Sequence, residues 1–137
     1  EFMGGVEYLD QLLTMADFVS IHASLTSKSR HMINRKSFEL MKPTSFLINV
    51  ARGDIVEESA LLDALNTGQI RGAGLDVFSQ EPLDTTHPFL SMENVVVTPH
   101  IAGVTSGTSS RRAHAAADNI ERISQGSRPN YLVTTAE

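Results

Sequence analysis

The chain has 137 residues, the size of one ordinary domain, which excludes two complete domains closing over a substrate. Hydrophobic residues make up 41% and charged residues 20%, a globular composition that excludes disordered and fibrous proteins. The formal net charge of −5 offers no basic field to a nucleic acid or an anionic membrane, and the lack of cysteine excludes disulfides and thiolate sites.

The first three residues, Glu1-Phe2-Met3, resemble a cloning remnant ahead of a start codon. No apolar run approaches the roughly 20 residues that a membrane-spanning helix needs, and no basic segment precedes a long apolar one. We therefore expect a cytoplasmic protein with no membrane partner, folded over residues 4–137.

Apolar periodicity predicts helices and strands in alternation along the chain. Leu9, Leu12 and Leu13 recur at helical spacing, and Asn34 is a typical helix cap. In chain order we expect a helix over 6–16, a strand over 18–22, a helix over 34–41, a strand over 46–50, a helix carrying Leu61, Leu62 and Leu65 that stops at Gly68, strands over 72–78 and 95–98, and a long helix through 113–123 that ends near Gly126.

Strands separated by helices are typical of βαβ units. We therefore predict an α/β fold, a partial Rossmann-like (doubly wound) parallel sheet with helices on both faces. Ligands of such sheets bind beyond the carboxyl ends of the strands. Five polar residues follow strands at this edge: His22, Arg52, Asp76, Glu81 and His100.

Three of these residue types suit hydride transfer to a carbon that bears oxygen. An imidazole can exchange the hydroxyl proton, a carboxylate can hold its tautomer, and a guanidinium can bind a substrate carboxylate with two hydrogen bonds. His100, Glu81 and Arg52 are candidates for these three roles in turn.

Four segments, in this order, resemble the D-isomer-specific 2-hydroxyacid dehydrogenase family. The match runs from about Val6 to about Val133 and is carried by Asn49-Val50-Ala51-Arg52-Gly53, Gly74-Leu75-Asp76-Val77-Phe78, Gln80-Glu81-Pro82-Leu83 and Thr98-Pro99-His100-Ile101-Ala102-Gly103. The stretch 60–68 and the segment 87–90 are similar to phosphoglycerate dehydrogenase and glyoxylate or hydroxypyruvate reductase members.

The resemblance implies roles for single residues. Arg52 would bind the carboxylate and carbonyl of a small 2-hydroxy or 2-oxo acid, His100 would be the acid/base, and Glu81 would pair with it. Asp76 would hold the nicotinamide carboxamide of NAD or NADP. Ser24, Thr26, Val50, Ala51, Ala102 and Gly103 would border the dinucleotide.

Other readings of the same residues stay open. Asp76 could cap a loop, Glu81 could start a turn before Pro82, and His100 could be a satisfied core histidine. His22 is expected to be structural or to contact the cofactor loop, and the remaining histidines, His31, His87 and His114, are expected at the surface.

Two other enzyme classes fit the sequence less well. A zinc hydrolase on His22, Glu81 and His100 lacks the short ligand spacing of such sites. The segment 103–107 differs in spacing from the Gly-x-Ser-x-Gly of serine hydrolases. We expect no metal.

The sequence contains no G-x-G-x-x-G segment and no substrate domain, so we expect the C-terminal part of a nucleotide-binding domain that lacks its first two strands. In the strand order 3-2-1-4-5-6, strands 18–22 and 46–50 would be the third and fourth, each left with an unpaired edge. They would pair with each other, exchange with a second copy or bind a missing half, which predicts a homo-oligomer or strand-swapped dimer. The alternative function is a non-catalytic fragment that self-associates and binds no cofactor.

Overall fold

The computed structural model describes residues 8–133, and the expected cloning remnant and the first residues of the 6–16 helix lie outside them. The chain forms two units, one that ends at Ile101 and one that begins at Ala102. Neither contains, among the described residues, a helix long and apolar enough to cross a membrane.

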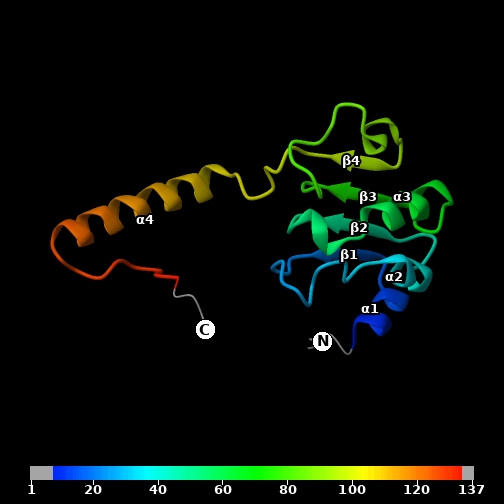
Figure 1. The fold of residues 1–137 in the computed structure, drawn as a ribbon, viewed down its shortest axis with the longest axis horizontal. Helices are drawn as coiled ribbons and strands as arrows, with labels where there is room; N and C mark the ends of the chain where they lie inside the picture. The colour runs from blue at the N-terminus through cyan, green and yellow to red at the C-terminus, as the bar shows by residue number, and fades with distance from the viewer. Residues whose placement is uncertain (1–7, 134–137) are drawn as a thin grey trace. The chain divides into compact units, whose positions relative to one another are not determined.

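The first unit follows the predicted order of helices and strands (Figure 1). The α/β class and the parallel sheet are thereby confirmed, and each strand ends before the polar residues expected at its carboxyl end. The elements are α1 (Leu9–Met15), β1 (Phe18–Ile21), α2 (Arg35–Leu40), β2 (Phe46–Asn49), α3 (Glu58–Asn66), β3 (Gly72–Leu75) and β4 (Val95–Val97), with short 3-10 helices η2 (Gly53–Ile55) and η3 (Pro88–Ser91) that the sequence did not predict.

The sheet has the order β1-β2-β3-β4 with every pair parallel. Phe18 lies opposite Phe46, which lies opposite Gly72. Because β2 is paired on both sides, the expectation of an unpaired edge at 46–50 is wrong. Direct pairing, one of the three expected outcomes, is the one observed.

One face of the sheet carries the core. Alternate strand residues such as Val19, Leu47 and Leu75 point to that face and pack in one cluster with Phe38 of α2 and Leu61 of α3. Helix α2 contacts both α1 and α3.

The other face of the sheet is open within residues 8–101. Phe18 and Val96 are each 68% exposed there, and the rings of Phe18 and Phe46 stack at 5.4 Å. Helices were expected on both faces, but those of the first unit cover one.

The second unit is a helix with a returning tail. Helix α4 (Ser106–Ser124) starts at a capping box formed by Thr105 and Thr108. After the helix, Asn119 donates to the carbonyl of Asn130 at 3.1 Å and accepts from its N–H at 2.7 Å. No residue of α4 is buried, and Ile120 is 71% exposed.

Candidate active site

The turn after β2 is held by a buried amide. Asn49, 1% exposed, donates through Nδ2 to the carbonyl of Arg52 at 2.9 Å and accepts from the N–H of Ala51 at 3.1 Å. This role of Asn49 was not predicted, although a polar residue at the end of an otherwise apolar strand indicates it. The amide fixes where the Arg52 side chain leaves the sheet.

The next residue, Gly53, lies against the segment after β3. A Cβ at Gly53 would lie 2.0 Å from the carbonyl carbon of Phe78 and 2.4 Å from the nitrogen of Ser79. Only glycine allows this approach, so the Arg52 turn and the segment that leads to Glu81 are in direct backbone contact.

Glu81 and His100 form a pair. Glu81 Oε2 lies 2.8 Å from His100 Nδ1, and Glu81 Oε1 accepts from the N–H of Phe78 at 3.0 Å. The hydrogen bond with His100 lowers the pKa of Glu81 most, the Phe78 N–H adds to this, and the charge of Arg52 contributes less. The carboxylate is therefore ionised at neutral pH.

Asp76 holds the segment that carries His100. The carboxylate is 3% exposed, and its Oδ1 accepts from the Thr98 hydroxyl at 2.5 Å and from the N–H of Ile101 at 2.8 Å. Between these two contacts His100 adopts a φ of 54°, a left-handed conformation that L-residues adopt at a cost. Asp76 therefore caps this loop, one of the two roles that the sequence left open.

The three candidate catalytic residues line one cavity of about 280 Å³. Arg52 reaches it from β2, Glu81 from the segment after β3, and His100 from the segment after β4. Because Nδ1 of His100 faces Glu81, Nε2 is the ring nitrogen available to a ligand. The residues that line this cavity are Leu25, Arg52, Gly53, Asp54, Phe78, Ser79, Glu81 and His100.

A second, polar cavity of about 400 Å³ adjoins the first, since Leu25 and Arg52 line both. Three of the expected cofactor residues, Ser24, Val50 and Ala51, line it. Thr26 is not in its lining. The Thr26 hydroxyl instead bonds the N–H of Ser29, which closes the turn that follows Leu25.

Two expected cofactor residues, Ala102 and Gly103, belong to the second unit and are exposed. His22 lines the polar cavity, and its Nε2 lies 2.8 Å from the Ser20 hydroxyl. Residues 8–133 contain no group of three or more His, Asp or Glu side chains arranged to hold a metal, so the zinc alternative gains no support.

Among the histidines expected at the surface, His31 and His114 are exposed, whereas His87 is not. The His87 side chain is 16% exposed and contacts Glu58 at 3.1 Å. The surface expectation for His87 is therefore wrong, because its ring also packs against the buried Phe89 at 4.7 Å.

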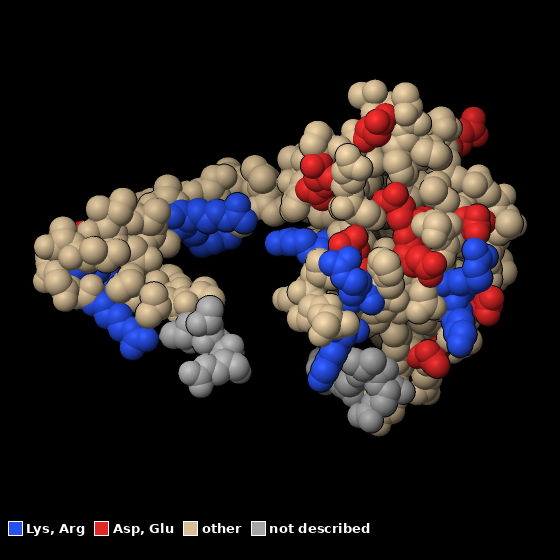
Figure 2. Space-filling view, viewed as in Figure 1, with Lys and Arg blue, Asp and Glu red and all other residues tan. Residues whose placement is uncertain are grey.

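Charged side chains of both signs are interleaved on the face of the first unit in view (Figure 2). Three exposed ion pairs account for part of this pattern: Arg30–Asp54, Arg35–Asp63 and Lys42–Asp17. Such exposed pairs contribute little to stability, because water and salt screen their charges.

The fold and the site together define the family. The family model described as "D-isomer specific 2-hydroxyacid dehydrogenase, NAD binding domain" matches residues 2–102. The chain belongs to the D-isomer-specific 2-hydroxyacid dehydrogenases, and the matched part is their NAD-binding domain.

The proteins that this chain resembles include reductases and dehydrogenases by name. The chain is 46% identical over 131 residues to a glyoxylate reductase of Korarchaeum cryptofilum. The matched stretch covers 94% of this chain and 40% of that protein. A D-isomer-specific 2-hydroxyacid dehydrogenase of Xanthobacter autotrophicus Py2, solved with NADPH and MES, matches with a TM-score of 0.79 and 36% identity over 95% of this chain and 53% of that one. A D-lactate dehydrogenase of Lactobacillus jensenii, solved with NAD+, matches with a TM-score of 0.82 and 31% identity over 91% of this chain and 42% of that one. The chain thus spans about 40% of the curated relative.

Proposed function

We propose that this chain carries the proton-transfer and acid-binding residues of an NAD(P)-dependent reductase of small 2-oxo acids. The observation that supports this most is the 2.8 Å contact between Glu81 Oε2 and His100 Nδ1, in a cavity that Arg52 also lines. His100, held by Glu81, can donate a proton, and the guanidinium of Arg52 can bind a carboxylate. The names of the relatives favour glyoxylate or hydroxypyruvate as the substrate.

In the direction of reduction, His100 donates the proton on Nε2 to the carbonyl oxygen of the acid as that oxygen gains charge. Glu81 stabilises the imidazolium form through Nδ1 and fixes the orientation of the ring. Arg52 binds the carboxylate and turns the carbonyl carbon toward the cofactor cavity. In oxidation, the hydroxyl proton returns to His100.

The polar cavity beside Arg52 fits the nicotinamide end of a dinucleotide. It lies at the carboxyl ends of β1 and β2, and Ser24, Val50 and Ala51 line it. Bound there, the nicotinamide supplies the hydride that reduces the carbonyl carbon, so that NAD(P)H is oxidised and the oxo acid becomes a hydroxy acid. Asp76, at the end of β3, would contact the carboxamide. Ala102 and Gly103 are proposed to border the dinucleotide as well.

A chimera tests this function. This chain replaces the 131-residue segment that it matches in the Korarchaeum cryptofilum reductase, and turnover of glyoxylate and hydroxypyruvate is followed by NAD(P)H absorbance. We expect activity that is lost by at least about 100-fold in His100→Gln. Glu93→Gln, an exposed carboxylate outside both cavities, is the matched control and should leave turnover unchanged. A folded chimera without activity on any small 2-oxo acid would contradict the function.

A second candidate function is self-association without catalysis by the 137-residue chain alone. The open sheet face with Phe18 and Val96 favours it, since soluble monomers rarely expose large contiguous apolar patches. We propose that the chain forms a homo-oligomer through this face.

A further inference from the structure

Glu58, the first residue of α3, contacts both ends of the segment that carries Glu81. Its Oε2 accepts from the Ser79 hydroxyl at 3.0 Å, and its Oε1 lies 3.1 Å from His87 Nε2. In the connection between β3 and η3, Ser79 lies near the start and His87 at the end, and Glu81 lies between them. One carboxylate thus ties this connection at two points to the start of a packed helix.

His87 meets Glu58 in one defined tautomer. The N–H of Phe89 donates to His87 Nδ1 at 3.3 Å, so Nδ1 is an acceptor and the proton lies on Nε2, which donates to Glu58. The Phe89 ring under His87 is 2% exposed. The contact between His87 and Glu58 is therefore anchored in the core and is partly shielded from solvent, with side-chain exposures of 16% and 30%.

The contact at Ser79 lies one residue from the group that positions Glu81. The N–H of Phe78 donates to Glu81 Oε1, and the other Glu81 oxygen contacts His100. The backbone at Phe78 and Ser79 also lies against Gly53. The peptide between Phe78 and Ser79 is thus in contact with the Arg52 turn and is hydrogen-bonded, through Ser79, to Glu58.

We propose that Glu58 is a positioning residue for the Glu81–His100 pair, acting through Ser79 and His87. The expected effect on catalysis rests on the proposed function, whereas the expected effect on the geometry of the pair does not. Loss of the Glu58 carboxylate releases both ends of the connection, so Glu81 loses the fixed Phe78 N–H and holds the His100 ring less firmly.

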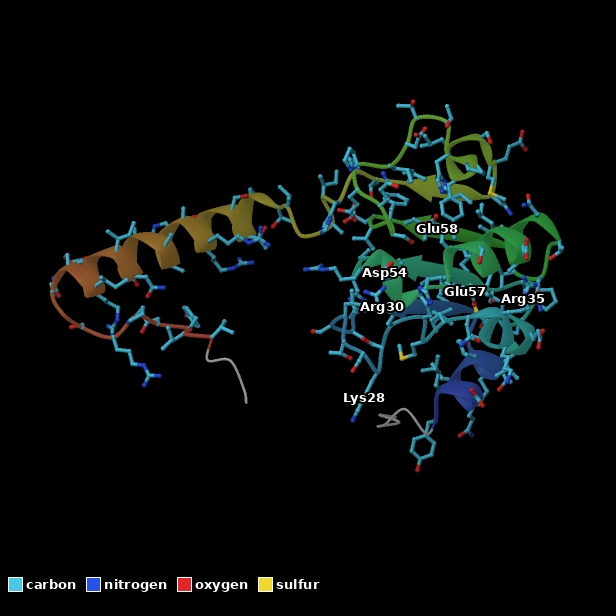
Figure 3. All side chains as sticks on the ribbon, viewed as in Figure 1. Lys28, Arg30, Arg35, Asp54, Glu57 and Glu58 are labelled. Atoms are coloured by element: carbon cyan, nitrogen blue, oxygen red, sulfur yellow. The ribbon has the colours of Figure 1, made fainter. Side chains whose placement is uncertain are left out.

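The neighbouring Glu57 provides a matched control. In Figure 3 Glu57 lies on the side of Arg35, whereas Glu58 lies nearer β3. The charge of Glu57 acts on Arg35, and Glu57 makes no side-chain cap bond to α3. Replacing either glutamate removes the same charge from the same end of the same helix, but only Glu58 contacts the connection.

Nuclear magnetic resonance of the 137-residue chain tests the geometry without any turnover. The readouts are the ring ¹⁵N shifts of His100, which report its hydrogen bond to Glu81, and the pH midpoint of the Glu81 side-chain carboxyl. We expect Glu58→Ala to change the His100 ring shifts and to raise the Glu81 midpoint toward its ordinary value, because the contacts that lower the pKa are loosened. Glu57→Ala should change neither.

A folded Glu58→Ala protein with both readouts as in the unmodified chain would overturn the inference. If Glu58→Ala does not fold, Ser79→Ala decides, because Ser79 is exposed and the change removes only one hydroxyl bond. It should move both readouts in the same direction by a smaller amount, and no movement would also overturn the inference.

Kinetics in the chimera separate this inference from the proposed function. Glu58→Ala should lower kcat by on the order of tenfold and leave KM for glyoxylate nearly unchanged, since Arg52 is intact. An inactive unmodified chimera contradicts the proposed function but leaves the resonance result standing. Unchanged kcat and unchanged resonances contradict the role of Glu58 alone.

Discussion

Gly53 and Phe78 are in backbone contact: a Cβ at Gly53 would lie 2.1 Å from the carbonyl oxygen of Phe78. The contact joins the turn that presents Arg52 to the segment that positions Glu81. Two parts of the site that are 25 residues or more apart in the chain therefore lie against each other, and they can do so because Gly53 has no Cβ.

The first prediction concerns this contact. Gly53→Ala should destabilise the chain by about 3 kcal/mol or more, at or above the upper end for overpacking, because the groups that must move are backbone atoms. Gly74→Ala is the matched control: its Cβ would lie 3.7 Å from Ile48 Cγ1, an ordinary contact. Urea unfolding of both variants measures the difference. Equal midpoints would contradict the prediction.

The second prediction concerns the pH profile of reduction. Because the pKa of Glu81 is lowered, its carboxylate is ionised throughout the neutral range and stays so to a more acid pH than an ordinary glutamate. The contribution of the pair to reduction should therefore be fully present at neutral pH and be lost as the pH falls through the lowered pKa of Glu81. Glu81→Gln has no carboxylate to ionise, so its kcat/KM for glyoxylate should be lower at neutral pH and should lack this acid limb. An acid limb at the same pH in both proteins argues against the pairing.

Most elements of the first unit could be predicted from the sequence. The strands came out within three residues of their observed ends, because apolar runs bounded by Pro43 or by polar site residues are strong signals. The convergence of Arg52, Glu81 and His100 followed from the rule that parallel strands share a carboxyl edge. Which strands are neighbours did not follow, since an apolar run of residues does not specify its partner.

The support of the site was harder to predict than its central residues. Glu58 and His87 are 29 residues apart, and nothing in their local sequence indicates that one carboxylate joins them. Asn49 could have been assigned from its place at the end of an apolar strand. The steric role of Gly53 depends on a backbone 25 residues away, so only the folded chain shows it.

A third prediction concerns the guanidinium. Arg52→Lys keeps the charge but loses the planar pair of donors, so it should not restore the function lost in Arg52→Ala. Both variants of the chimera should show KM for glyoxylate raised by roughly 10- to 100-fold, the equivalent of one charge-assisted hydrogen bond. Steady-state kinetics provide the comparison, with Arg71→Lys, an exposed arginine at the other end of β3, as control. Full activity in Arg52→Lys would show that charge alone suffices.

A fourth prediction concerns association of the 137-residue chain. Light scattering at micromolar concentration should give a mass above the 14.9 kDa of one copy, because the open face with Phe18 and Val96 is apolar. Val96→Lys should shift the mass toward a monomer. Met15→Lys, a substitution at a similarly exposed residue of α1, should not. A compact monomer for the unmodified chain would refute this.

The fifth prediction is weak binding of dinucleotide by the 137-residue chain. The sequence has no G-x-G-x-x-G turn to hold a pyrophosphate on backbone N–H groups, and the net charge of −5 repels an anion. Losing several charge-assisted hydrogen bonds of roughly 1.5–3 kcal/mol each moves a micromolar site toward millimolar. Calorimetry with NADH should therefore give a Kd near or above the millimolar range. A low micromolar Kd would contradict this and would indicate that a second copy contributes to the site.

Asp76, which we propose contacts the cofactor, also holds the backbone around His100, the proposed proton donor. One oxygen of its carboxylate accepts from Thr98 and Ile101, the residues on both sides of the strained His100 backbone. A substitution at this position would release that backbone toward a relaxed conformation and swing the imidazole away from Glu81. Its kinetic phenotype would then mix a defect in dinucleotide affinity with a defect in proton delivery, and only the double variant with Glu81→Gln would separate the two contributions.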